Sequence, residues 1–280
     1  MKTLSLFSVL LVASAATAAN LGEQEHEHET PNCCTPAADL APRASYLVNA
    51  NPLAKDEVQG TATGKVVFEG EKRPDVQDLV ISEKQEKGCV EGGHTDKTNR
   101  SLMISKEGGI ANVVITIDVD GAKLKLPEEP IVLDQIACRF EPHVMLVPMG
   151  ATAKYHNSDS ISHNVHTYST KNPAFNKTIA AGASEEQKLE KAESIEVKCD
   201  IHPWMSCYLF VSDTPFAATT AADGSFSIPG LAPGEYTAKV WHETLGKAKA
   251  TVTIGADGKS EAIEIKMGEK KKGGGGRRRR

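Results

Sequence analysis

The amino-acid sequence predicts an all-β protein made of two successive β-sandwiches. Gly (23 residues) and Pro (14 residues) recur at short intervals along the 280 residues, and the runs between them are rich in β-branched residues. Apolar residues at helical spacing are hard to find. The overall mixture, with 40% hydrophobic and 25% charged residues, is sufficient for a sizeable core.

The first sandwich is expected over residues 59–213. Residues 64–70 form a short strand-like run closed by glycine, and residues 111–119 form a longer β-branched run that ends at Asp120-Gly121. Residues 83–100 are polar and should form a loop. Further strands are expected at residues 131–133, 143–147, 151–156, 163–168, 194–198 and 208–211.

Turn residues separate these runs at even spacing, which is typical of an antiparallel sandwich or barrel. One such turn, Pro148-Met149-Gly150, lies between residues 143–147 and residues 151–156. These two strands should therefore pair like a hairpin.

A second, smaller β-sandwich module is expected over residues 214–267. Turn signals within it include Asp223-Gly224 and the Pro- and Gly-rich run at residues 229–234. The alternation of apolar and polar residues predicts its strands at residues 217–220, 225–228, 236–241, 250–254 and 262–265.

The N-terminus is typical of an exported protein. Lys2 precedes a mostly apolar run over residues 4–13, and Ala16-Thr17-Ala18 places small residues at the spacing of a cleavage site. Residues 1–19 are therefore expected to be a signal peptide cleaved near Ala18 or Ala19, and the mature protein to be periplasmic or secreted. The apolar run is too short for a permanent membrane anchor, so no integral membrane segment is expected.

Two polar segments flank the sandwiches. Residues 20–58 are expected to be a disordered linker, and residues 268–280 a disordered basic tail with seven Lys and Arg residues. The chain has a formal net charge of −5 in spite of this tail, so its body is acidic. An acidic exported body disfavours nucleic acid as a partner. The tail is either simply solvated or in weak contact with an anionic surface.

The motif that carries chemistry is Cys199-Asp-Ile-His202-Pro-Trp-Met205. A thiolate and an imidazole three residues apart on a tight loop can reach one point, and a thioether three residues later can approach it too. A thiolate, two imidazoles and a weak axial thioether are typical of copper electron-transfer sites, whereas zinc prefers sets without a thioether. Pro203 should stiffen the loop, and Trp204 should pack beside the site.

The second imidazole must come from another part of the chain, and His143, His163 and His166 are the upstream candidates. His163 follows a turn rich in Asn, Asp and Ser, and Asn164 beside it could hydrogen-bond to the backbone near Cys199. His166 is three residues into the strand and should face the opposite side, while His143 is interpreted as a structural histidine. The predicted ligands of one copper ion are therefore His163, Cys199, His202 and Met205.

A ligand role for Cys199 requires that this residue stays outside disulfides. Cys89 and Cys138 then make a candidate structural disulfide, although the sequence does not determine the connectivity of its six cysteines. Cys207 is interpreted either as the partner of another cysteine or as a small buried thiol.

Two loops resemble those of the cupredoxin family. Residues 157–164 and residues 199–205 are similar to the copper loops of plastocyanin, pseudoazurin and amicyanin, and the spacing Cys-x2-His-x2-Met is most similar to amicyanin. The wider chain, with Cys138 to His143 before these loops and Trp241-His242-Glu243 after them, resembles exported bacterial proteins described as methylamine-utilization or plastocyanin-like. In those proteins a cupredoxin-like domain precedes a carboxypeptidase-regulatory-like β-sandwich.

The resemblance implies a Greek-key sandwich, one type-1 copper bound by the four residues above, and one-electron transfer between redox protein partners. It does not imply peptidase activity, because a fold does not specify a function. The long insert around Cys89 departs from small cupredoxins, so their docking surface is not implied.

An electron carrier is thus the leading function, and no enzymatic activity is expected. Two alternatives stay open: a copper chaperone or scavenger, with Glu25-His26-Glu27-His28 and His143 as weak extra sites, and a surface-binding structural module. Hydrolases are disfavoured because the sequence has no nucleophile elbow, no paired zinc-type histidine motif and no phosphate-binding glycine loop.

Overall fold

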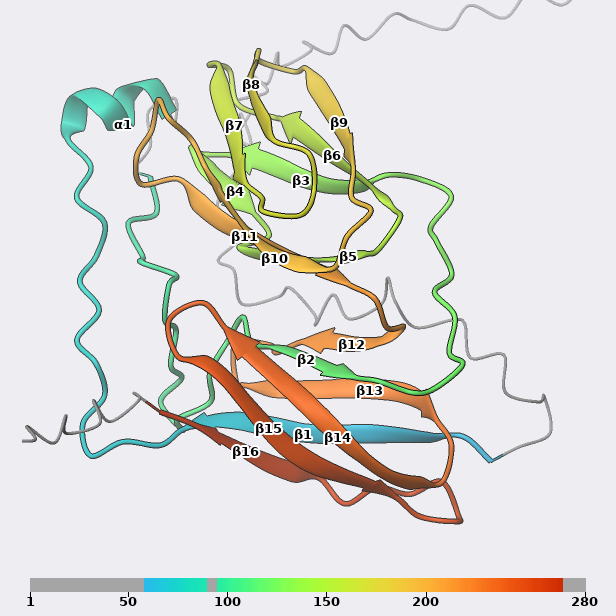
Figure 1. The fold of residues 1–280 in the computed structure, drawn as a ribbon. Coiled ribbons are helices and arrows are strands. Elements are labelled where there is room, and N and C mark those ends of the chain that lie inside the picture. Colours follow the sequence, from blue (N-terminus) through green and yellow to red (C-terminus); the bar gives the residue numbers. More distant parts are fainter. Residues whose placement is uncertain (1–57, 90–94, 269–280) are drawn as a thin grey trace, which may run out of the picture. The chain divides into compact units, whose positions relative to one another are not determined.

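A computed structural model describes residues 58–89 and 95–268 of the chain. The expected signal peptide lies outside the described residues, and so do almost all of the linker and of the basic tail. The described part is built from β-strands, with one short helix, and forms β-sandwich layers (Figure 1). The all-β sandwich prediction is therefore confirmed.

The first sandwich consists of a five-stranded sheet and a four-stranded sheet. The five-stranded sheet has the order β5-β11-β10-β7-β8, and the four-stranded sheet the order β4-β3-β6-β9. Their bounds are β3 (Ile131–Ile136), β4 (Arg139–Glu141), β5 (Val144–Pro148), β6 (Thr152–Asn157), β7 (His163–Tyr168), β8 (Phe175–Ile179), β9 (Ser184–Lys188), β10 (Glu193–Lys198) and β11 (Ser206–Ser212). Buried residues between the two sheets form one core, which includes Leu133, Tyr155, Val165, Ile195 and Leu209.

The prediction that β5 and β6 pair as a hairpin is wrong. β5 pairs in parallel with β11, whereas β6 belongs to the opposite sheet and pairs with β3 and β9. The turn between them crosses from one sheet to the other, because the Met149 N–H donates to Ser212 and the Gly150 N–H donates to Leu189. Gly150 has φ +96°, a left-handed conformation that suits glycine at such a corner.

The second sandwich contains strands from both ends of the described chain. Its sheets have the orders β12-β2-β14-β15 and β13-β1-β16. Their bounds are β1 (Gly60–Phe68), β2 (Val114–Ile117), β12 (Phe216–Thr219), β13 (Ser225–Leu231), β14 (Gly234–His242), β15 (Gly246–Ile254) and β16 (Ile263–Met267).

β1 and β2 were expected in the first sandwich, over residues 59–213, but their pairing places them in the second. β1 lies between β13 and β16, and β2 lies between β12 and β14. Without β1 and β2, the strands after residue 214 would leave a gap in each sheet. β2 fills the gap in one sheet and β1 fills the gap in the other. The domain boundary predicted between residues 213 and 214 therefore does not separate the strands of the two sandwiches.

The two sandwiches contact each other through a separate apolar cluster. Val144 and Leu146 of β5 pack with Val114 of β2 and Ala217 of β12. Trp241 adds ring contacts with Tyr208 and Phe210, at centroid distances of 5.2 Å and 5.5 Å. These contacts explain why β5 is buried along its whole length, since its two faces serve two different apolar clusters.

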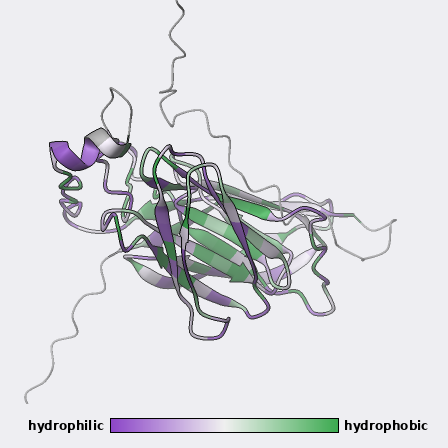
Figure 2. Ribbon diagram, turned by 90° about the horizontal axis from the view of Figure 1, so that it is seen from above, coloured by the Kyte–Doolittle hydropathy of each residue, from purple (hydrophilic) through white to green (hydrophobic). Residues whose placement is uncertain are grey.

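The segment expected to be a loop at residues 83–100 contains the helix α1 (Glu83–Cys89). Its start has one half of a capping box, because the Gln85 side chain accepts the Ser82 N–H at 3.1 Å. Figure 2 shows that α1 is largely hydrophilic, whereas hydrophobic residues are concentrated along the strands. The polar composition that suggested a loop therefore reflects an exposed helix. No helix in the described residues is long and apolar enough to cross a membrane.

Candidate metal centre

The loop at residues 199–205 connects β10 to β11 and turns back on itself. The Cys199 N–H donates to the Met205 carbonyl at 3.2 Å, and the Met205 N–H donates to the His202 carbonyl at 2.9 Å. Both ends of the loop are buried, since Cys199 is 2% exposed and Met205 is 1% exposed. His202 between them is only partly buried. The loop thus holds its sulfur atoms inside and its imidazole near the surface.

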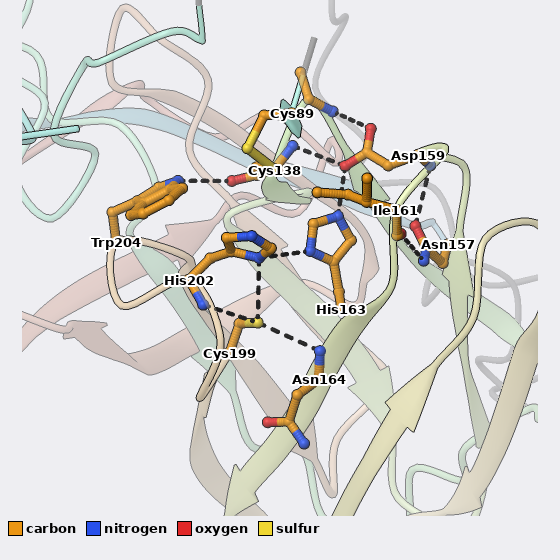
Figure 3. The surroundings of a disulfide bond; sticks show 11 residues. Cys89, Cys138, Asn157, Asp159, Ile161, His163, Asn164, Cys199, His202 and Trp204 are labelled. Atoms are coloured by element: carbon orange, nitrogen blue, oxygen red, sulfur yellow. Dashed lines mark hydrogen bonds and ion pairs between the residues drawn. A yellow bond between two sulfur atoms is a disulfide. The ribbon is translucent and has the colours of Figure 1, made fainter. Parts of the chain in front are cut away.

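The structure brings His163, Cys199 and His202 together (Figure 3). The two Nδ1 atoms of the imidazoles are 2.9 Å apart, and the Cys199 Sγ lies 3.8 Å from the His202 Nδ1. All three ligand atoms lie within 4.8 Å of one another. His163 reaches this point because it begins β7, and β7 pairs with β10 immediately before Cys199.

The surroundings of Cys199 favour its thiolate form. Burial alone would raise the pKa of the thiol, but contacts with the imidazoles of His163 and His202 and two backbone N–H groups outweigh burial and lower the pKa from 9.0 to about 6. The N–H groups are those of Asn164, at 3.3 Å, and of His202, at 3.4 Å. At neutral pH the site therefore presents a thiolate, which is the form that binds metals.

Asn164 joins the two loops that supply the ligand atoms. Its backbone N–H donates to the Cys199 sulfur, and its side-chain oxygen accepts the Asp200 N–H at 3.1 Å. Its side-chain nitrogen donates to Asn176 on β8. This is the loop-to-loop contact that the sequence suggested for Asn164.

His163 is fully buried and is oriented by Asp159. The Nε2 of His163 lies 2.7 Å from the Asp159 carboxylate, which accepts the ring proton and leaves Nδ1 facing the other donors. Burial would lower the pKa of His163, but Asp159 and the Cys199 sulfur outweigh burial and raise it. This role of Asp159 was not predicted from the sequence. The available signal was its position in the polar turn four residues before His163.

Trp204 packs beside the site, in the place expected from the sequence. Its ring centroid is 5.1 Å from that of His202, and its Nε1 donates to the Cys138 carbonyl at 3.2 Å. Pro203 lies exposed in the same turn.

Met205, the predicted fourth ligand, is buried in the core of the first sandwich at the end of the loop. Its backbone position is fixed by the two hydrogen bonds that close the loop. Ligation by its thioether stays a prediction.

The other two upstream histidines lie elsewhere. His166 interacts with Asp200, at 3.1 Å, and stacks on Tyr168 with a centroid distance of 4.3 Å. His143 pairs through Nε2 with Glu243, which follows β14. Neither belongs to the group of ligand atoms around Cys199.

The structure contains the disulfide between Cys89 and Cys138, and its sulfur atoms lie within 4.8 Å of a His202 ring nitrogen. Among the described residues, Cys199 and Cys207 are free thiols. Cys207 is fully buried, and burial raises its pKa well above 9.0. It is therefore a protonated core residue and not a competing ligand.

Comparison with known proteins gives partial matches. The family described as polysaccharide lyase family 4, domain II, matches residues 207–262, which is less than half of the chain and is not the carboxypeptidase-regulatory family expected for this region. A search of curated proteins finds no match.

Solved structures of copper proteins align with about a third of the chain. A copper-containing nitrite reductase from Thermus scotoductus aligns at 22% identity and a TM-score of 0.29, over 35% of this chain and 25% of its own. The P52G mutant of amicyanin aligns at 20% identity and a TM-score of 0.29, over 35% of this chain and 98% of its own. A purple cupredoxin from Nitrosopumilus maritimus aligns at 22% identity and a TM-score of 0.27, over 29% of this chain and 99% of its own. This chain thus spans only a quarter of the nitrite reductase.

Proposed function

We propose that the protein binds one copper ion with His163, Cys199, His202 and Met205 and transfers single electrons between redox proteins. The observation that carries this proposal is the convergence of two imidazole Nδ1 atoms and one thiolate, all within 4.8 Å, with His163 and Cys199 buried and His202 partly buried. Bound copper would supply a one-electron couple that cycles between its two oxidation states.

The donor set fits copper. The Nδ1 to Nδ1 distance of 2.9 Å and the Sγ to Nδ1 distance of 3.8 Å are of the size expected when each atom binds one central ion at about 2.0–2.3 Å. Zinc would also accept these three donors. The buried thioether at the end of the same loop is the feature that favours copper over zinc.

The residues around the ligands would keep the site rigid through a redox cycle. Asp159 holds the ring of His163, and Asn164 ties its loop to Asp200, so two of the three strong donors are fixed before metal binds. His202 is the one imidazole ligand that is not fully buried, and we propose it as the point of electron entry and exit.

The cellular setting and partners are part of the proposal. The features of residues 1–19 favour export, so the partners would be redox proteins of a periplasmic or extracellular space. Catalysis at the copper is not proposed, because the ligand set already uses the four donors that an electron carrier needs. A chaperone role is not proposed. Of its weak extra sites, Glu25 to His28 lie outside the described residues, and His143 is paired with Glu243 and belongs to no cluster of ligand atoms.

The visible absorption spectrum tests this function. Copper-loaded protein is expected to show an intense thiolate-to-copper band with one copper per chain, and Cys199→Ser should abolish it. Cys207→Ser is the matched control, because this second free thiol is buried and lies outside the cluster of ligand atoms, so its loss should leave the band unchanged. A colourless protein that binds one copper, or a band that survives in the Cys199 variant, would overturn the proposal.

A further inference from the structure

The turn between β3 and β4 has an unusual backbone for its sequence. Ile136 pairs with Arg139, so Ala137 and Cys138 form a two-residue hairpin loop. Both have positive φ, 52° and 54°, which is the signature of a type I′ turn. Such turns favour Asn and Gly, because a Cβ atom disfavours the left-handed region. Contacts around this turn must therefore stabilise it.

A carboxylate beside the candidate metal centre supplies those contacts. Asp159 accepts the Ala137 N–H at 2.6 Å on Oδ1 and the Cys138 N–H at 2.8 Å on Oδ2. The same Oδ2 accepts the Nε2–H of His163 at 2.7 Å. Two successive N–H groups of a turn that converge on one anion form a typical anion-binding nest. The Asp159 side chain, 7% exposed, thus connects the turn directly to one imidazole.

The other side of the turn reaches the second imidazole. The Cys138 carbonyl accepts the Trp204 Nε1–H at 3.2 Å, and the Trp204 ring packs against His202. The Cys89–Cys138 disulfide lies on the same side, near the His202 ring (Figure 3). The Ala137–Cys138 turn therefore contacts both Asp159, which binds His163, and Trp204, which packs against His202.

We propose that the Ala137–Cys138 turn is a common support for both imidazoles of the metal centre, with Asp159 as the positioning residue for His163 and Trp204 as the positioning residue for His202. The disulfide anchors the turn to α1. The proposal rests on metal binding by His163, Cys199 and His202, but part of its test uses metal-free protein.

The first test compares Asp159→Ala with Asp134→Ala. Asp134 is a matched control, because its carboxylate accepts hydrogen bonds from Ser158, the neighbour of Asp159, and touches neither imidazole. In metal-free protein, the His163 Nε2–H proton should give a resolved NMR signal in the wild type and in Asp134→Ala. This signal should be absent in Asp159→Ala. A signal that persists in a folded Asp159→Ala protein overturns the proposal whether or not metal binds.

The second test is a double-mutant cycle on metal affinity, with Co²⁺ as the probe because its binding to a thiolate is visible without copper redox chemistry. Asp159→Ala should weaken binding by about 10–100-fold, the usual effect of removing a group that orients a metal ligand. Asp159→Asn should be intermediate, since its one oxygen still accepts from His163. Trp204→Phe should weaken binding by a smaller factor.

Because both residues act through one turn, the double variant should lose less affinity than the product of the two single losses. A loss equal to that product would show independent supports and overturn the common role. Thermal unfolding of each metal-free variant verifies that it folds. Co²⁺ binding with a colourless copper form would overturn the electron-transfer function and leave the positioning test intact.

Discussion

The Cys199 thiol should titrate far below an ordinary cysteine when the protein is metal-free. The structure lowers its pKa from 9.0 to about 6, a difference of about three units. Three units correspond to roughly 4 kcal/mol of preference for the thiolate in the folded protein, at about 1.36 kcal/mol per unit. The preference comes from the hydrogen bonds of the sulfur with His163, His202 and the Asn164 N–H, which outweigh the opposing effect of burial.

The thiolate absorbance in the ultraviolet measures this pKa directly. The difference between wild type and Cys199→Ser isolates the contribution of one thiol as pH is raised from 4 to 10. Cys207 stays protonated through the neutral range, because burial raises its pKa well above 9.0. His202→Ala removes one hydrogen-bonding partner and should move the midpoint upward, toward the ordinary value.

The same shift predicts how stability depends on pH. The folded state depresses this pKa, so its contribution to the free energy of unfolding is present above pH 9 and is lost as pH falls toward 6. Wild type should therefore exceed Cys199→Ser by a margin that grows from pH 6 to pH 9. The raised pKa of His163 acts in the opposite direction and reduces the slope. A thiol midpoint between pH 8 and 9 would refute the reasoning about the site.

Further variants test the site and the fold. Met205→Leu should shift the visible band and the reduction potential while changing the free energy of unfolding by less than about 1.5 kcal/mol, as volume-conserving changes do; an identical spectrum would exclude Met205 as a ligand. His166→Ala should leave copper affinity unchanged, because this ring pairs with Asp200 away from the other donors, and a titration showing weaker binding would contradict that placement. Removing the disulfide with Cys89→Ala and Cys138→Ala should cost about 4 kcal/mol of unfolding free energy in denaturant titrations, from the 49-residue separation it closes. Deleting residues 214–280 should give an aggregating protein by light scattering, because β1 and β2 lose every strand they pair with; a monodisperse, folded fragment would argue against the observed pairing.

The sequence predicted best those features that depend on local pattern. Strands such as β7, which has the same bounds as the prediction, contain β-branched and aromatic residues. The cluster of His163, Cys199 and His202 was predictable because the motif spacing confines two donors to one loop. β8 and β9 were not expected, because their exposed polar residues hide the alternation.

Pairing between distant segments could not be predicted from local pattern. Nothing in residues 60–68 indicates that β1 pairs with β13 and β16 and not with its neighbours in sequence. Asp159 was missed for a related reason, since its role depends on the Ala137–Cys138 turn, and nothing in the sequence indicated that those two residues adopt positive φ. Such contacts arise only when tertiary structure brings separate segments together.

The place of β1 and β2 between later strands also bears on the order of folding. The strands of the first sandwich are contiguous, from Ile131 to Ser212, so this sandwich can form as soon as that stretch of chain is available. β1 must wait, because its partner β16 ends at Met267. Pairings of such long sequence separation are slow to form, and an unpaired strand is prone to aggregation while it waits. The first sandwich, which holds the candidate metal centre, can therefore fold before the second sandwich, although the second contains β1 and β2 from the start of the described chain.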